Sequence, residues 1–193
     1  FRHREGLEIL LQAADLARRN NDLHSEVVTC YWAALAQSNV GDLEGMRLTA
    51  GAGLDAAERL NDRSWLALAL WNSQMAAKLE GSWQTARDKG DRGLTVSPRE
   101  CRILYTSVLE EYEVGDFSQA GAYLEKFLDA MHQTGPGFNA EYAFASCLIP
   151  MIACITGKSE RLDVAETAAK PFFHHGRPVA VANLVSSPKP AWG

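Results

Sequence analysis

Few side chains in this sequence have a type and spacing suited to metal binding or nucleophilic attack. The adjacent His174 and His175 could share a metal ion, but no third ligand follows them at a fixed spacing. We interpret them as part of an irregular tail. None of the four cysteines forms the C-x-x-C pair that is typical of zinc sites; they are Cys30, Cys101, Cys147 and Cys154. We interpret the cysteines as small buried apolar residues in a reducing, cytoplasmic environment.

Motifs for catalysis are also missing from the sequence. It has no G-x-S-x-G for a nucleophilic serine, no H-E-x-x-H for a catalytic zinc and no G-x-x-x-x-G-K-[ST] for phosphates. The acidic run "EEYE" at 110–113 places Glu110 and Glu113 on one side of a helix, and we expect both to face solvent. The sequence therefore predicts no catalytic residue, no cofactor and no metal in this chain.

Composition and charge restrict the class of partner. The 193 residues are 47% hydrophobic and 22% charged, with a net charge of −5, which is ordinary for a globular protein. The longest basic cluster is Arg18-Arg19, so the clustered basic face that nucleic acids require is missing. No window reaches about 18 continuous apolar residues. We expect neither a nucleic acid nor a membrane as a direct partner.

The chain repeats one turn at regular intervals. "NVGDLEGM" at 39–46 matches "LEGSWQTA" 40 residues later, and "EVGDFSQA" follows after a further 34, which superposes Gly41, Gly81 and Gly115. At the shift of 40, Asn21-Asp22 also falls on Asn61-Asp62. A fourth turn is expected near Gly157. Self-similarity at such periods is the signature of stacked structural units.

Between these turns the pattern is helical. "FSQAGAYLEKFLDAMHQ" has apolar residues every three or four positions, and "SWLALALWNSQMAAKL" is apolar on nearly every side, as expected of a fully covered helix. We predict an all-α fold of about four antiparallel hairpins, each with an inner helix, a turn and an outer helix. The predicted helices cover 4–20, 22–40, 43–60, 63–80, 83–95, 99–114, 117–133, 139–156 and 159–170.

The glycines have two predicted roles. At the turns, the residue after a helix takes the left-handed conformation, which costs other residues about 1 kcal/mol or more. Asp42, Asp116 and Ser82 are then placed to cap the following helix. Gly53 and Gly93 instead lie inside outer helices, where they predict a close approach to a neighbouring helix.

The pattern resembles tetratricopeptide-like repeats over about residues 5–170. "GDFSQAGAYLEKF" supplies the Gly-Asp pair, the following aromatic Phe117 and the small Ala120, and Pro98 falls at the closing proline of a unit. The helix residues Cys30, Ala34 and Gln37 depart from the family pattern, and two shifts are 40 rather than 34. These features are similar to the long C-terminal repeats of bacterial LuxR-type ATPase regulators and of adenylate or guanylate cyclases.

The resemblance implies a right-handed solenoid with a binding groove. An aromatic residue stands ten positions before three of the turn glycines: Tyr31, Trp71 and Tyr105. The equivalent family position lines the groove, where such a row of partly exposed rings would bind a protein or peptide. The alternative is packing between successive inner helices. The full set of candidate groove residues is Tyr31, Asn39, Trp71, Lys78, Tyr105 and Tyr112, with Glu113 nearby.

The resemblance also implies the functional class. In such proteins the repeat region is a docking scaffold or sensor, and the chemistry lies in other domains. We therefore expect residues 1–171 to form a non-catalytic protein-interaction domain, a fragment of a larger signalling or regulatory protein. A ligand- or peptide-sensing segment is the alternative. We expect residues 172–193 to be an irregular tail, and uncapped apolar surface near residues 1–20 to favour self-association.

Overall fold

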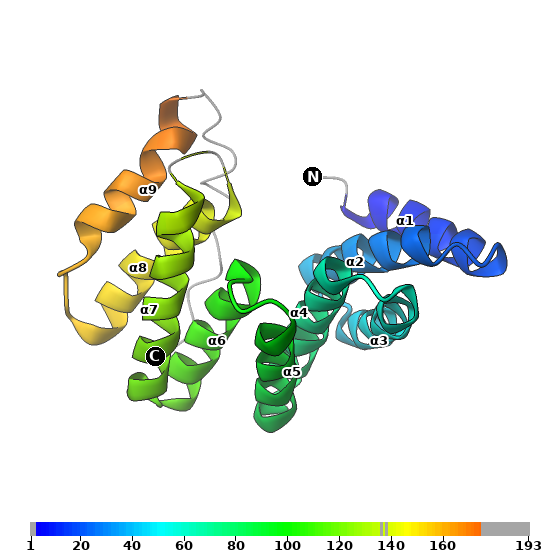
Figure 1. Ribbon diagram of the computed structural model, residues 1–193, viewed down its shortest axis with the longest axis horizontal. Helices are drawn as coiled ribbons and strands as arrows, with labels where there is room; N and C mark the ends of the chain where they lie inside the picture. Colours follow the sequence, from blue (N-terminus) through cyan, green and yellow to red (C-terminus); the bar gives the residue numbers. More distant parts are fainter. Residues whose placement is uncertain (1–2, 136, 138, 175–193) are drawn as a thin grey trace. The chain divides into compact units, whose positions relative to one another are not determined.

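The computed structural model describes residues 3–135, 137 and 139–174, and this part of the chain contains nine α-helices and no strand (Figure 1). The all-α prediction is therefore confirmed for the described residues. Expected and observed helix bounds agree within a few residues. The helices are α1 (His3–Arg19), α2 (Leu23–Val40), α3 (Leu43–Leu60), α4 (Arg63–Leu79), α5 (Trp83–Val96), α6 (Cys101–Val114), α7 (Phe117–Thr134), α8 (Ala140–Thr156) and α9 (Leu162–His174).

The repeated turn has one geometry, set by two adjacent residues. Gly41 and Gly115 follow α2 and α6 in the left-handed conformation, at φ values of 79° and 85°, and Gly157 ends α8 in the same way. The next residue caps the following helix: an Asp42 oxygen accepts from the Gly45 amide at 2.9 Å. The turns at Gly41 and Gly115 thus satisfy backbone groups that the ends of two helices would leave without partners.

In the turns before α2 and α4, asparagine takes the place of glycine. Asn21 and Asn61 are left-handed, with φ values of 59° and 57°, and Asp22 and Asp62 cap α2 and α4. Asparagine is the non-glycine residue that tolerates this conformation best. The expected cap at Ser82 is absent, since its side chain makes no hydrogen bond to the first turn of α5.

Three helix ends differ from the expected bounds by two residues or more, and one of them is the start of α9, at Leu162 rather than 159. The α6 helix begins at Cys101 rather than near 99, because a Glu100 carboxylate oxygen accepts from the Arg102 amide and makes Glu100 the cap. The α9 helix continues to His174, past the expected start of the tail at 172. His175 and the rest of the expected tail lie outside the described residues.

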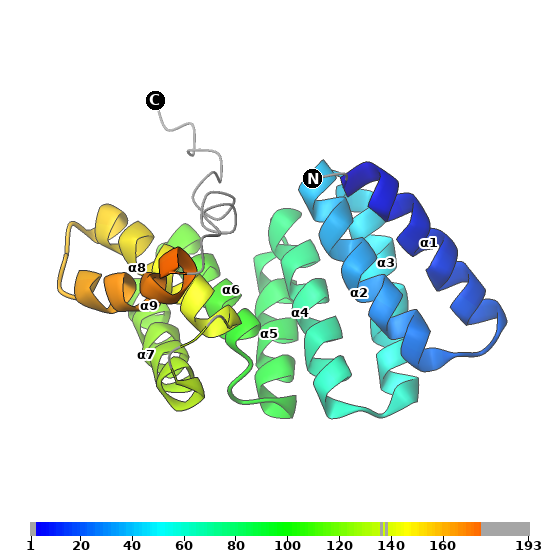
Figure 2. The ribbon, with the colours of Figure 1, turned by 90° about the horizontal axis from the view of Figure 1, so that it is seen from above.

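The chain divides into two compact units, and the boundary between them falls in the sequence between Ala120 and Gly121. In the first unit, successive helices from α1 to α5 lie side by side (Figure 2), and α2, α4 and α6 also pack against one another in sequence. We call α2, α4 and α6 the inner helices, and α1, α3 and α5 the outer helices. In the second unit, α8 packs against α9.

The core of the first unit depends on small residues that let helix axes approach. One cluster joins α2, α3 and α4 through Val27, Leu54 and Leu70, with alanines between them. A Cβ atom added to Gly53 would lie 3.0 Å from the Cys30 Cβ, and one on Gly93 would lie 2.4 Å from the Ile103 Cδ1. The predicted close approach at both glycines is confirmed.

The second unit has its own buried side chains. Phe127 of α7 and Leu148 of α8 are fully buried, and Ala168 of α9 is buried as well. An ion pair between Arg161 and Glu125 ties the start of α9 to α7. Across the described residues of both units, no helix is both long and apolar enough to cross a membrane.

We predict opposite effects for two glycine substitutions near α3. Gly41→Ala should lower the free energy of unfolding by about 1 kcal/mol, because alanine is strained at a positive φ. Gly51→Ala should raise it by about 0.5–1 kcal/mol, because Gly51 is helical and exposed, with no atom near the added methyl group. Urea unfolding measures both, and equal effects would contradict the turn geometry.

Candidate functional site

The aromatic residues predicted to line a groove lie largely inside the stack of inner helices. The Tyr31 and Trp71 rings have centroids 6.0 Å apart and pack with Ile103 in one cluster. Tyr31 is 8% exposed and Trp71 is 7% exposed, whereas Tyr105 is half-buried. The expected row of partly exposed rings is therefore wrong for Tyr31 and Trp71. The neighbouring inner helix covers each of them, as the apolar character of these helices requires.

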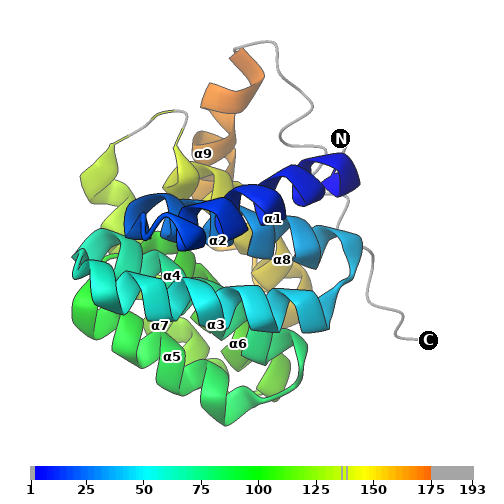
Figure 3. The ribbon, with the colours of Figure 1, turned by 90° about the vertical axis from the view of Figure 1, so that its right-hand side faces the viewer.

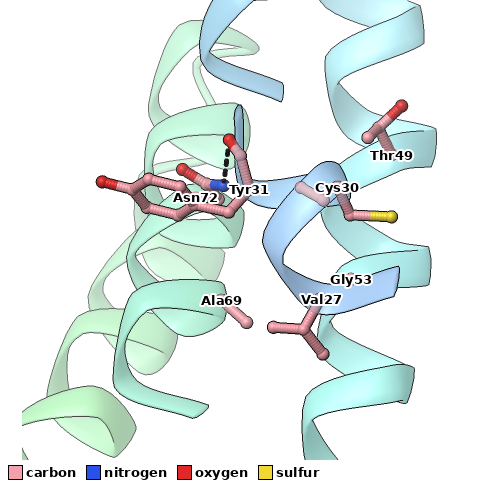
Figure 4. A pocket seen from close by; sticks show the side chains of 8 residues that line it. Val27, Cys30, Tyr31, Thr49, Gly53, Ala69 and Asn72 are labelled. Carbon is pink, nitrogen blue, oxygen red and sulfur yellow. Dashed lines mark hydrogen bonds between the residues drawn. The ribbon is translucent and has the colours of Figure 1, made fainter. Parts of the chain in front are cut away.

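Polar contacts join each inner helix to the next one. The Trp71 Nε1 donates to the Thr106 hydroxyl of α6 at 2.9 Å, within the core. One residue along α4, the Asn72 amide donates to the Tyr31 backbone carbonyl of α2 at 3.2 Å (Figure 4). Buried polar groups make such bonds because losing a partner costs about 1–3 kcal/mol. These contacts fix the register of α2, α4 and α6.

The remaining predicted residues lie at the protein surface or close to it. The Lys78 Nζ of α4 forms an ion pair with Glu113 of α6 at 2.6 Å. Asn39 is exposed, and its amide donates to the Leu35 carbonyl of its own helix at 2.9 Å. Tyr112 is half-buried, with its ring centroid 5.7 Å from that of Phe117. The structure brings Lys78 of α4 and Glu113 of α6 together, whereas the hydrogen bond of Asn39 stays within α2.

A set of half-buried apolar side chains lies on the inner helices, including the two helices that carry the Lys78–Glu113 pair. Leu68 and Met75 of α4 cover the Tyr31–Trp71 cluster, together with Leu35 of α2. On α6, residues 105, 109 and 112 are half-buried and share one side of the helix. We call this set the inner surface: Leu35, Leu68, Met75, Tyr105, Leu109 and Tyr112.

Sequence reasoning missed four of these residues, Leu35, Leu68, Met75 and Leu109, although the signal was present. Leu68 and Met75 are separated by seven positions, and Lys78 follows Met75 by three, so all three share one side of α4. The helix looked apolar on nearly every side, which hid the side that stays partly exposed. Aligning α4 with α2 and α6 by the repeat shifts would have identified that side.

A polar group lies buried between α4 and α6, where the sequence suggested solvent. Glu110 is 1% exposed, and the Gln74 amide nitrogen donates to the Ser107 hydroxyl at 3.0 Å and to a Glu110 oxygen at 3.4 Å. Gly90 of α5 faces this group, since an added Cβ would lie 2.8 Å from the Gln74 nitrogen. The expectation of a solvated Glu110 was wrong, because α4 and α5 cover that side of α6.

The neighbouring carboxylate is buried as well, but it has a cationic partner. Glu111 receives two hydrogen bonds from the Arg87 guanidinium of α5, at 2.6 and 2.8 Å, which raises the pKa of Arg87. Glu110 lacks such a pair. Burial raises the pKa of its carboxyl to about 7, and the nearby Glu111 charge adds to this effect. The Gln74 hydrogen bond and the charges of Arg87 and Lys78 oppose it.

Two cavities adjoin the inner helices and the outer ones behind them. The cavity of Figure 4, lined in part by Val27, Cys30 and Asn72, has a volume of about 10 Å³, the minimum for one water molecule. A second cavity of about 220 Å³ opens between α1, α2 and α3, where it is lined by Leu11, Leu48 and Arg18 among others. Arg18 is engaged there, since its Nε donates to Glu26 at 2.8 Å.

The four cysteines differ in burial. Cys30 and Cys101 are buried as expected, whereas Cys147 is half-buried and Cys154 is exposed. Burial raises the pKa of the Cys30 thiol to about 11, which keeps it protonated and a poor nucleophile. Within residues 3–135, 137 and 139–174, no three His, Cys, Asp or Glu side chains are grouped closely enough to hold a metal ion.

Comparison with models of known protein families gives no match to this chain, and comparison with curated proteins gives none either. The resemblance to tetratricopeptide-like repeats therefore depends on the sequence pattern alone.

We predict that Trp71 is far more important for stability than Tyr105. Trp71→Ala should lower the free energy of unfolding by about 3–5 kcal/mol, because it opens a cavity in a closed core. Tyr105→Ala should cost only about 1–2 kcal/mol, since its ring is half-buried. Denaturant melts of both variants give the comparison. A cost below about 2 kcal/mol at Trp71 would contradict its core position.

Glu110 should make stability fall as pH rises. The folded carboxyl keeps its proton up to a pKa of about 7, whereas the unfolded one releases it near 4.5. The folded state therefore binds more protons between these values, and stability present below pH 4.5 is lost as pH rises through 7. Glu110→Gln, which is always neutral, should be more stable than the wild type above this window, by about 1–3 kcal/mol.

Urea melts at about pH 5 and about pH 8 would measure this difference. Glu113→Gln is the matched control on the same helix. Glu113 lies at the surface, where its ion pair with Lys78 contributes about 0–1 kcal/mol. The same pH dependence in the wild type and in Glu110→Gln would show that Glu110 does not carry the effect.

Proposed function

We propose that this chain is a non-catalytic protein-interaction scaffold, arranged as a right-handed, tetratricopeptide-like solenoid, and that its inner surface binds a peptide segment of a partner protein. The observation that carries the proposal is that the inner-surface residues are apolar but only half-buried. The helices beneath them already have a closed core, with Leu70, Ile103 and Leu104 fully buried. The stack therefore does not require further apolar side chains at its surface.

The chemistry of the inner surface favours an apolar peptide with a polar flank. Leucine and methionine side chains offer adaptable apolar contact, and the two tyrosines add large rings that lose little entropy on binding. The Lys78–Glu113 pair lies on the same two helices and adds a polar group, of which the Glu113 carboxylate is the more exposed member. A segment with two or three apolar side chains beside a charged residue would match this arrangement.

The resemblance to bacterial regulators supports the same class of function. In those proteins the repeat region is a docking scaffold or sensor, and other domains perform the chemistry. For this chain we propose the docking role, because the inner surface gives it a place to bind. The proposed partner is a protein or peptide, with no cofactor required.

A peptide selection followed by measured affinities would test this function. Random peptides of about 12 residues are selected on the wild-type chain, and the dissociation constants of synthetic copies are measured by calorimetry. Tyr105→Ala should weaken the selected peptides about tenfold or more, because truncating an interfacial tyrosine removes a large contact. Melting curves of the variant show that it remains folded at the assay temperature.

Leu48→Ala is the matched control for this experiment. Leu48 is an exposed apolar residue of the outer helix α3, away from the inner surface, so its truncation should leave the affinity unchanged within about twofold. Peptides that bind Tyr105→Ala as well as the wild type would exclude the inner surface as their site. A selection that yields no specific binder would also count against the proposal.

A further inference from the structure

We propose that two copies of this chain pair through the side of α1 and α2 that faces away from α3 and α4. We call this side the end face, and its residues are Ile9, Ala13 and Leu16 of α1 with Trp32 and Ala36 of α2. The proposal concerns a different surface from the inner surface. It does not depend on peptide binding there.

The end face is strongly apolar and open to solvent. Ile9 and Leu16 are 66% and 60% exposed, and their spacing of seven residues places them on one side of α1. The adjoining side of α1, which packs against α2, carries Ala14 and Ala17, and both are buried. Trp32 of α2 is 53% exposed, although its ring makes an edge contact with Tyr31 at 5.0 Å. Large apolar patches of this kind mark interaction sites.

The internal repeat shows that such a side is covered elsewhere in the same unit. A shift of 40 carries Trp32 to Asn72, and a further 34 carries it to Thr106. Asn72 is buried against α2 and Thr106 against α4, and each makes a hydrogen bond to that preceding inner helix. Trp32 occupies the equivalent position on α2, but no inner helix of the described chain covers it.

The outer helices show the same difference: a side that is covered in α3 is exposed in α1. The shift of 40 carries Ala13 to Gly53 and Leu16 to Ala56, both of which are buried in α3. Gly53 packs directly on α2, at Cys30. In α1 the corresponding side carries the larger Leu16 and remains exposed. The end face thus has the position of a helix-packing surface, and the partner that fits it is another apolar helix surface.

The residues of α1 match those of a second copy in antiparallel orientation. If Ile9 of one copy lies against Leu16 of the other, the two-fold axis passes between residues 12 and 13, where the small Ala13 permits close approach. The same register places Glu5 near Arg19 of the second copy, and this contact occurs twice. Glu5 lies in the first turn of α1, beside Arg4, and Arg18 and Arg19 lie in its last turn, where Arg19 also pairs with Asp15 of its own chain. The contact between Glu5 and Arg19 of the two copies favours antiparallel pairing.

Figure 3 shows α1 and α3 in the foreground of the first unit. The partner of the end face is a second copy, rather than an unrelated helix, because this charge pattern is complementary to itself. A two-fold pair also closes on itself and buries both end faces at once. An interface that contains the exposed Trp32 and Ile9 side chains includes the large aromatic and aliphatic groups that interfaces commonly bury.

Sedimentation equilibrium of the full chain tests the pairing over about 1 to 200 µM. We expect the wild type to form dimers within this range. Ile9→Lys should raise the dimer dissociation constant about tenfold or more, because it places two charges in the apolar contact. Leu48→Lys is the control, since Leu48 is comparably exposed on α3 but lies outside the end face. Circular dichroism confirms that both variants remain folded.

A charge exchange tests the orientation separately. Glu5→Arg and Arg19→Glu should each weaken self-association, because each replaces two attractive contacts with two repulsive ones. An equimolar mixture should restore dimers, since the heterodimer regains opposite charges at both contacts. A wild-type chain that stays monomeric throughout would overturn the proposal. That result is expected if a helical segment of a longer polypeptide covers the end face instead. Dimers unaffected by Ile9→Lys would overturn it as well.

Discussion

The first unit depends on the packing of α4 between the two other inner helices. Successive residues of this helix contact different neighbours: Leu70 packs in the core with α2 and α3, Trp71 bonds to α6, and Asn72 bonds to α2. A helix in this position must be apolar on nearly every side, and its few polar side chains must find partners inside the protein. The buried rings of Tyr31 and Trp71 follow from this constraint, as does the need for small residues at close approaches such as Gly93.

The polar residues of the core contribute specificity at a cost in stability. Asn72, Gln74 and Glu110 each keep one oxygen without a hydrogen-bond partner in the described structure, which costs free energy relative to an apolar core. Their other atoms bond across helix boundaries, so sliding one inner helix along another by a turn would leave these atoms without partners too. A stack held by alanine and leucine alone would discriminate less well between such registers.

The sequence could predict features that a few neighbouring residues encode, but not features that depend on a helix distant in the chain. The turns at Gly41 and Asn61 were predictable because a left-handed residue followed by an aspartate cap is encoded within a few positions. Helix bounds followed from the same signals. The sides of the helices were harder to assign. Burial of Glu110 and exposure of Trp32 depend on which helix lies beside each residue, and that neighbour is about 35–40 residues distant in the chain. The repeat shifts contained this information, but an apolar pattern on nearly every side of α2 and α4 concealed it.

The helices of the first unit differ in how many neighbours hold them. Among the described residues, α4 packs against α2, α3, α5 and α6, whereas α1 packs against α2. Removing α4 would therefore abolish the unit, but α1 could detach while the remaining helices stay folded. Backbone amides of α1 should then exchange with solvent through a local opening that requires far less free energy than global unfolding. In the unpaired chain, the first helix would be the place in the first unit where proteases gain access and where thermal unfolding begins.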